Sequence, residues 1–246
     1  MKVIGIDPAP KRGLTVFDGT DHHIPPSDAA DFMRDLESEP DVLICWDAPL
    51  TGPSQVALDG NGVGFESDFT QRPIESFFRQ QKTGFKTPKG ISVRGYSGCP
   101  HWTITRSLVG LPRVGPYDRE LDEIPFRLAT SNEPKPGSGR WIVEVHPAVA
   151  AWLWCRESWE HDTWEYKNEE GARRAISERL KEIVPFETKG ARNDDELDAR
   201  IAFALGSMWL ASSDVFLLGD LGVGTLLLPE VAGLQRSFDR FIDGAK

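Results

Sequence analysis

Three apolar segments of the chain each end in a carboxylate with a proline close behind it, and a further acidic group opens a late helical pattern. These acids are Asp7, Asp47, Glu144 and the group Asp194, Asp195 and Asp198. Carboxylates that meet at one edge of a sheet repel one another unless a cation neutralises them. Oxygen-only ligand sets suit Mg²⁺ or Mn²⁺, and such ions activate water for the cleavage of phosphodiesters. The pattern therefore favours a metal site with Asp7, Asp47 and Asp198 as ligands. Glu144 and Asp195 (or Asp194) would act as auxiliary ligands or as the base that orients water.

Each acid also has an ordinary structural explanation. An Asp at the end of a strand is often only a turn residue, which would account for Asp7 or Asp47 taken alone. Acids in the first turn of a helix interact favourably with its dipole, which would account for Asp194 and Asp195. Asp198 lies one turn further in, on the flank of an apolar stripe, where a carboxylate needs a partner.

Two roles within this set are open. Asp194 and Asp195 lie four and three residues before Asp198, so either can share its side of the helix. A helical wheel places Asp194 nearer the buried stripe than Asp195. Glu144 would be a solvated residue if its strand lay at the edge of the sheet.

Short strands and amphipathic helices are the elements expected to position these acids. Strands are predicted at residues 3–6, 14–17, 22–24, 42–46 and 141–145, and a closing hairpin at 215–218 and 225–229. Helices are predicted from a Ser27 cap to residue 36, over 171–184, and over 194–212. We interpret residues 1–246 as a single α/β domain.

Residues 51–140 differ in kind from the rest and are interpreted as an inserted, partly helical lobe, with helices predicted at 73–81, 101–111 and 118–130. Eight basic and four acidic side chains lie between residues 51 and 116, within a chain whose net charge is −10. Aromatic residues are interleaved with these bases, as in surfaces that grip nucleic acid. The residues proposed to bind the substrate are Arg72, Arg79, Lys82, Arg94 and Arg106. A solvated lobe whose aromatic residues pack its own small core explains the segment nearly as well.

The composition limits the classes of function. With 28 basic against 38 acidic residues, the chain is unsuited to coating nucleic acid or membranes by bulk charge. Its three cysteines form no metal-binding pair and fit a reducing compartment. No signal peptide is apparent, and the longest mainly apolar stretch, 197–211, is too short to span a bilayer. We therefore expect a cytoplasmic protein without a membrane partner. The motifs GxxxxGK[ST], GxGxxG, GxSxG and HExxH are absent.

Four motifs, in order, resemble those of the DUF429 family, which is regarded as a ribonuclease H-like group of predicted nucleases. They are Ile4-Gly5-Ile6-Asp7-Pro8, Asp47-Ala48-Pro49-Leu50, Glu144-Val145-His146-Pro147-Ala148 and Asp194-Asp195-Glu196-Leu197-Asp198-Ala199. The closing hairpin, Gly219-Asp220 to Leu228-Pro229, is also similar. More widely, Asp7, Asp47 and the Asp195/Asp198 pair resemble the acids of Holliday-junction resolvases of the RuvC type, to which Glu144 is extra. The resemblance implies a mixed five-stranded sheet, its first three strands antiparallel, with helices on both faces. It also implies metal-dependent cleavage of nucleic acid.

Three hypotheses follow for the function. The leading one is a Mg²⁺- or Mn²⁺-dependent nuclease. A non-catalytic binding module with the same fold and acids is the main alternative. A nucleotide-dependent phosphotransferase of the actin-like branch is less favoured, because Pro8 and Pro10 remove N–H groups from the loop that would cradle phosphates.

Overall fold

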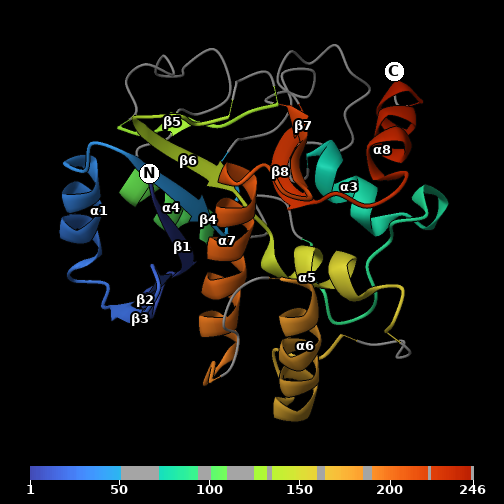
Figure 1. The fold of residues 1–246 in the computed structure, drawn as a ribbon, viewed down its shortest axis with the longest axis horizontal. Coiled ribbons are helices and arrows are strands. Elements are labelled where there is room, and N and C mark those ends of the chain that lie inside the picture. Colours follow the sequence, from blue (N-terminus) through green and yellow to red (C-terminus); the bar gives the residue numbers. More distant parts are fainter. Residues whose placement is uncertain are drawn as a thin grey trace.

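A mixed β-sheet organises the chain (Figure 1). The computed structural model describes residues 1–50, 72–93, 101–109, 125–131, 135–159, 164–184, 190–220 and 223–244, apart from the side chains of residues 102, 103 and 106. The sheet strands are β1 (Lys2–Ala9), β2 (Gly13–Phe17), β3 (Asp21–Ile24), β4 (Val42–Trp46), β5 (Arg127–Leu128) and β6 (Arg140–Glu144). Their spatial order is β3-β2-β1-β4-β6-β5. As expected, β1, β2 and β3 are antiparallel, whereas β4 and β6 continue parallel to β1.

The predicted five-stranded sheet is one strand too small, because β5 pairs in parallel with the outer side of β6. This strand also overturns the helix predicted over 118–130, as far as that segment is described. Phe126 and Leu128 are both buried. Two buried side chains at alternate positions suit a strand that faces a core on one side. The β5 pairing reaches only Trp141 and Ile142, but Glu144 beyond it is 2% exposed and is therefore not the solvated residue that an edge position would allow.

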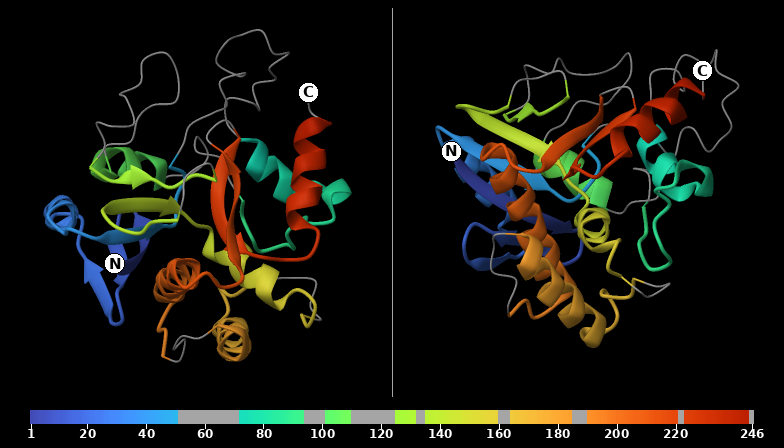
Figure 2. Two further views of the ribbon diagram at one scale, coloured as in Figure 1. Left: turned by 45° about the horizontal axis from the view of Figure 1, so that its top comes forward. Right: turned by 45° about the vertical axis from the view of Figure 1, so that its right-hand side comes forward.

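Helices cover both faces of the sheet (Figures 1 and 2). The helices are α1 (Ala29–Glu37), α3 (Pro73–Arg79), α4 (His101–Val109), α5 (Pro147–Cys155), α6 (Glu170–Ile183), α7 (Asp194–Leu210) and α8 (Leu234–Asp243), with a 3₁₀ turn η2 (Gln81–Thr83). Strand β4 alternates between two hydrophobic cores, since Leu43 and Cys45 pack with α5 and α7, whereas Ile44 and Trp46 pack with α1 and α4. Helix α1 begins after Asp28, and Ser27 donates its hydroxyl proton to Asp28 instead of capping the helix.

Helix α7 lies unusually close to the sheet because two glycines remove side chains from the contact. A Cβ on Gly5 of β1 would lie 2.0 Å from the carbonyl oxygen of Ala199, and a Cβ on Gly206 would lie 2.4 Å from the Cys45 sulfur. Such distances are far below van der Waals contact. The helix therefore sits directly on the β1 backbone, which fixes its acidic first turns beside the carboxyl end of that strand.

The predicted closing hairpin is confirmed by β7 (Val215–Asp220) and β8 (Gly224–Pro229), which pair antiparallel. A bridge between Val145 and Leu227 joins it to the end of β6. Helices α3 and α4 confirm two of those predicted within 51–140. The aromatic residues Phe77, Phe78 and Phe85 are buried in the same core as β4 and α7, rather than in a separate core or on a surface where bases could stack. Across the described residues, no helix has the length and apolar character needed to cross a membrane.

Candidate active site

Asp7 and Asp47 lie next to each other at the edge of the sheet. Ile6 of β1 is opposite Trp46 of β4 in parallel register, and the Asp47 amide donates to the Ile6 carbonyl oxygen at 2.9 Å. The two aspartates therefore follow paired residues on adjacent strands. The sequence predicted that strand β1 would end at Asp7. In the structure it continues to Ala9 through its pairing with β2. Only the parallel pairing ends there, and this leaves Asp7 at the junction where a ligand can approach.

Asp198 completes a group of three acids from three elements. It is fully buried on α7, one residue before the Ala199 carbonyl that contacts Gly5. Burial raises the pKa of the Asp7 carboxyl well above its usual value, and the charges of Asp47 and Asp198 raise it further. The pKa of Asp47 is raised in the same way, by burial and then by Asp198. In the described part of the chain, no group donates a hydrogen bond to the side chain of Asp7 or Asp47, so this negative charge is largely uncompensated.

Tyr166 and Lys167, from the turn before α6, bind the third acid, and sequence reasoning missed both. The Tyr166 hydroxyl donates to Asp198 Oδ1 at 2.5 Å, and Lys167 Nζ lies 2.9 Å from Asp198 Oδ2. The Asp198 charge, followed by those of Asp47 and Asp7, raises the pKa of Lys167 against the opposing effect of burial. A tyrosine and a lysine in a polar turn form no motif, and only the folded chain brings them to the carboxylates.

Of the two open candidates on α7, Asp195 is the more buried, at 7% exposed, while Asp194 is half-buried. The helical wheel was therefore wrong about which of them lies nearer the core. The close approach at Gly5 turns the face that carries Asp195, Asp198 and Ala199 toward the sheet. Arg12, in the β1–β2 turn, donates to Asp195 at 2.9 Å and holds this carboxylate in an ion pair. Both Asp194 and Asp195 line the cavity described below.

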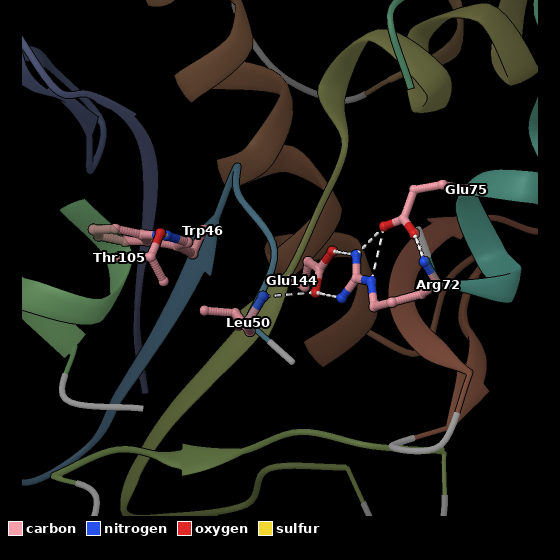
Figure 3. A network of polar contacts seen from close by, with 6 residues as sticks. All are labelled: Trp46, Leu50, Arg72, Glu75, Thr105 and Glu144. Atoms are coloured by element: carbon pink, nitrogen blue, oxygen red, sulfur yellow. Dashed lines mark hydrogen bonds and ion pairs between the residues drawn. The ribbon is translucent and has the colours of Figure 1, made fainter. Parts of the chain in front are cut away.

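Glu144 has a structural partner that the sequence did not reveal (Figure 3). Arg72 Nη1 donates to Glu144 Oε2 at 2.8 Å and Nη2 donates to Oε1 at 2.5 Å. The guanidinium also donates to Glu75, whose other oxygen accepts the Arg72 amide. The Leu50 amide donates to Glu144 Oε2 at 2.9 Å. Glu144 therefore fixes the loop after Asp47, and it is not free as a ligand or base.

The Arg72 side chain is only 1% exposed. The sequence placed it among the bases that bind phosphate, but its guanidinium is the shared counter-ion of Glu144 and Glu75, which raise its pKa against the effect of burial. Arg79 and Lys82 are exposed but lie outside the lining of the cavity. Arg94 and the Arg106 side chain lie outside the described residues. None of the described residues predicted to bind the substrate therefore places an exposed basic side chain beside the acids.

A cavity of about 350 Å³ is lined both by Asp7 and Asp47 and by the pair Glu75 and Glu144. Its polar lining residues are Asp7, Arg12, Asp47, Arg72, Glu75, Ser92, His101, Glu144, His146, Lys167, Asp194 and Asp195. Burial lowers the pKa of His146 to about 4, with help from the Lys167 charge, and burial also lowers the pKa of His101. Both imidazoles are thus neutral near pH 7. His146 Nδ1 is buried without a hydrogen-bond partner in the described structure.

The donor set fits a hard divalent cation in its chemistry. Asp7 and Asp47 offer oxygen atoms that no described group binds, and burial next to other acids makes their negative charge costly without a cation. The third carboxylate is engaged, because Tyr166 and Lys167 hold both Asp198 oxygens. Accordingly, no group of three or more His, Cys, Asp or Glu side chains within the described ranges is arranged to hold a metal ion.

Fold and site together define an α/β protein with a carboxylate-lined cavity at the carboxyl ends of its parallel strands. Residues 5–217 match the family model described as protein of unknown function (DUF429), and the chain therefore belongs to the DUF429 family. No curated protein and no solved structure matches the chain.

Proposed function

We propose that this protein is a metal-dependent nuclease with a ribonuclease H-like fold, which hydrolyses phosphodiester bonds of nucleic acid. The observation that carries the proposal is the Asp7–Asp47 pair. Buried Asp7 and half-buried Asp47, at the ends of two paired parallel segments, line one cavity without hydrogen-bond donors among the described residues. Beyond the effect of burial, the charge of Asp47 raises the pKa of Asp7, and the charge of Asp198 raises the pKa of both. A structural ion pair would have supplied a partner for each, as the chain does for Glu144.

The strand order supports the fold assignment. An antiparallel β1-β2-β3 unit followed by parallel β4 and β6 gives the five-strand core that the DUF429 resemblance implies, with β5 as an addition at the edge. Helix α7 supplies the Asp195-x-x-Asp198 pair on the face that packs against β1. Acids from β1, β4 and α7 therefore converge as the resemblance to RuvC-type resolvases implies.

The chain's own residues would divide the work as follows. Asp7, Asp47 and Asp198 would hold Mg²⁺ or Mn²⁺ through their carboxylate oxygens. When bound, such an ion activates water and stabilises the charge of the leaving oxygen. Arg12, which is 62% exposed and paired with Asp195, stands at the cavity where a phosphate would arrive. His101 and His146, both neutral near pH 7, line the same cavity.

The alternative functions differ in what they require of the same site. A binding module would keep the acids without turnover. A phosphotransferase would need free backbone N–H groups in the β1–β2 turn, but the Arg12 amide donates to the Ala9 carbonyl oxygen at 3.1 Å. Together with the two prolines, this bond leaves the turn poor in donors for a nucleotide phosphate.

The test is a cleavage assay of the full chain with Mg²⁺ and with Mn²⁺, on single-stranded, double-stranded, hybrid and branched nucleic acids. We expect cleavage of at least one substrate, lost on addition of a chelator and reduced by at least about a hundredfold in Asp7→Asn and in Asp47→Asn. Asp35→Asn, which alters an exposed carboxylate of α1, is the matched control.

Three outcomes decide among the hypotheses. Cleavage that survives both substitutions would exclude the proposed site. Binding of nucleic acid without cleavage under any metal would favour the binding module. Calorimetric binding of ATP with no effect on nucleic acid would favour the phosphotransferase.

A further inference from the structure

Lys167 occupies the place where a metal ion would have to bind its third ligand. Its ammonium lies 2.9 Å from one oxygen of Asp198, while the other oxygen accepts the Tyr166 hydroxyl. The lysine charge also lowers the pKa of Asp7 and of Asp47, against the effects of burial and of the neighbouring acids. Lys167 is thus the main described positive charge that acts on Asp198, Asp7 and Asp47.

An ammonium and a divalent ion cannot both occupy this place. Both positive charges would lie within contact distance of the same Asp198 carboxylate, which is 1% exposed, and two cations held so close together repel each other. One ammonium also leaves three ionised carboxylates under-compensated, which favours replacement by an ion of charge +2. The two cations should therefore compete.

The lysine side chain is able to leave. It is 46% exposed, whereas Asp198 beneath it is 1% exposed, so the lysine alone has a route to solvent. Its backbone is held in place, because Arg173 donates to the Tyr166 carbonyl oxygen at 3.0 Å and the Trp164 amide donates to the Lys89 carbonyl oxygen at 2.7 Å. A fixed backbone and a flexible side chain keep the ammonium within the cavity that Lys167 lines when it leaves Asp198.

We propose that Lys167 exchanges with the metal: its ammonium binds Asp198 in the metal-free protein, and a divalent ion displaces it into the cavity, where it binds a phosphate of the substrate. This inference rests on the proposed metal-dependent function. The exchange would make phosphate binding depend on the metal, since the Lys167 ammonium is released to bind a phosphate only when a divalent ion occupies the site. The substrate class is a phosphodiester, whose anionic oxygen suits a mobile ammonium.

Metal affinity is the first readout. Mn²⁺ binding would be measured by calorimetry for the full chain, for Lys167→Met and for Lys167→Arg. Removal of the competing charge should tighten binding in Lys167→Met by at least about tenfold, while Lys167→Arg keeps the competition and stays near the wild type. Equal or weaker binding by a folded Lys167→Met variant would overturn the exchange and leave Lys167 as a fixed structural ion pair.

Chemical labelling of the lysine is the second readout. The Lys167 amine, held by carboxylates, should react slowly with an amine-directed reagent and faster when Mn²⁺ is added, as mapped by mass spectrometry. Lys181, which is paired with Glu178 at 2.7 Å on α6, is the matched control and should not respond. No increase at Lys167 in the presence of bound Mn²⁺ would contradict displacement.

The two proposals fail in different ways. If the wild type binds no Mn²⁺ but Lys167→Met does, the competition stands and the metal-dependent function of the natural protein does not. If neither binds Mn²⁺, both are overturned. If both bind with the same affinity, only the exchange is excluded.

Discussion

Two sets of acids meet at one cavity, and they differ in how their charge is compensated. Glu144 and Glu75 sit on either side of the Arg72 guanidinium, with further hydrogen bonds from the backbone amides of Leu50 and Arg72 (Figure 3). Asp7 and Asp47 have no such donors among the described residues and share the single ammonium of Lys167 with Asp198. The first set is a completed structural network, whereas the second is short of positive charge.

The contrast identifies which acids are available for chemistry. A buried carboxylate that is fully hydrogen-bonded stabilises a particular arrangement of the chain, here the loop after β4. A buried carboxylate without partners costs folding free energy, and such a cost persists where a ligand offsets it. Sequence position alone does not separate Glu144 from Asp47, since Glu144 is the last residue of β6 and Asp47 directly follows β4. Their partners do.

The largest effect is expected from breaking the completed network. Arg72→Met removes the shared cation and leaves two buried carboxylates unpaired, so we expect the free energy of unfolding to fall by about 3–5 kcal/mol. Denaturant unfolding measures the loss. The control is Arg79→Met, which alters the exposed last residue of α3, the helix that Arg72 precedes. It should change the free energy of unfolding by less than about 0.5 kcal/mol.

A second variant separates charge from packing in this network. The triple substitution Arg72→Met, Glu75→Gln, Glu144→Gln removes the stranded charges along with the arginine and should recover part of the lost stability. If the triple variant is no more stable than Arg72→Met alone, loss of packing, and not unpaired charge, explains the defect.

The sequence was sufficient for the elements whose signals are local. Apolar runs that end in Asp predicted β1 and β4, and the acidic group from Asp194 to Asp198 with its apolar stripe predicted α7. Their meeting point could also be expected, because the carboxyl ends of parallel strands share one edge of a sheet. The sixth strand was missed because β5 has only two residues, and a two-residue strand has no detectable period.

The partners of the acids could not be predicted, for a physical reason. Arg72 precedes Glu144 by 72 residues, and Lys167 precedes Asp198 by 31. Each pairing depends on how loops fold over the sheet and leaves no periodic pattern in the sequence. A basic residue within a basic segment therefore suggested a surface that binds nucleic acid, although Arg72 is the buried counter-ion of two glutamates.

His146 lines the cavity that the two sets of acids share, and its pKa, lowered first by burial, is lowered further by both cations, Lys167 and Arg72. Burial, with Lys167 and Arg72, lowers its pKa from 6.5 to about 4, so the folded protein binds fewer protons here than the unfolded chain between these values. Stability due to this group is therefore complete above about pH 6.5 and is lost as the pH falls toward 4, by about 2 kcal/mol at pH 5. Unfolding at pH 7.5 and 5.0 measures the loss, and His146→Gln should remove it. An equal loss in the variant would show that other groups cause it.

Asp7 and Glu144 should respond to neutralisation with opposite signs. Asp7→Asn removes an uncompensated charge and should stabilise the metal-free protein at pH 7 by about 1 kcal/mol. Glu144→Gln weakens a completed network and should destabilise it by about 1–2 kcal/mol. Because the folded pKa of Asp7 is raised, the gain from Asp7→Asn should shrink as the pH falls toward 4. Destabilisation by both substitutions would mean that Asp7 has a structural partner.

The smallest effect is expected where no charge is involved. The Trp46 indole donates to Thr105 Oγ1 at 2.8 Å on the face of β4 that packs against α4, and Thr105 is fully buried (Figure 3). Thr105→Val keeps the shape of the side chain but leaves the indole N–H unsatisfied, which should cost about 1 kcal/mol in denaturant unfolding. Mn²⁺ affinity should not change, because the bond lies on a different face from Asp198 and carries no net charge. A loss as large as that of Arg72→Met would show that the number of broken hydrogen bonds, and not stranded charge, sets the cost at this site.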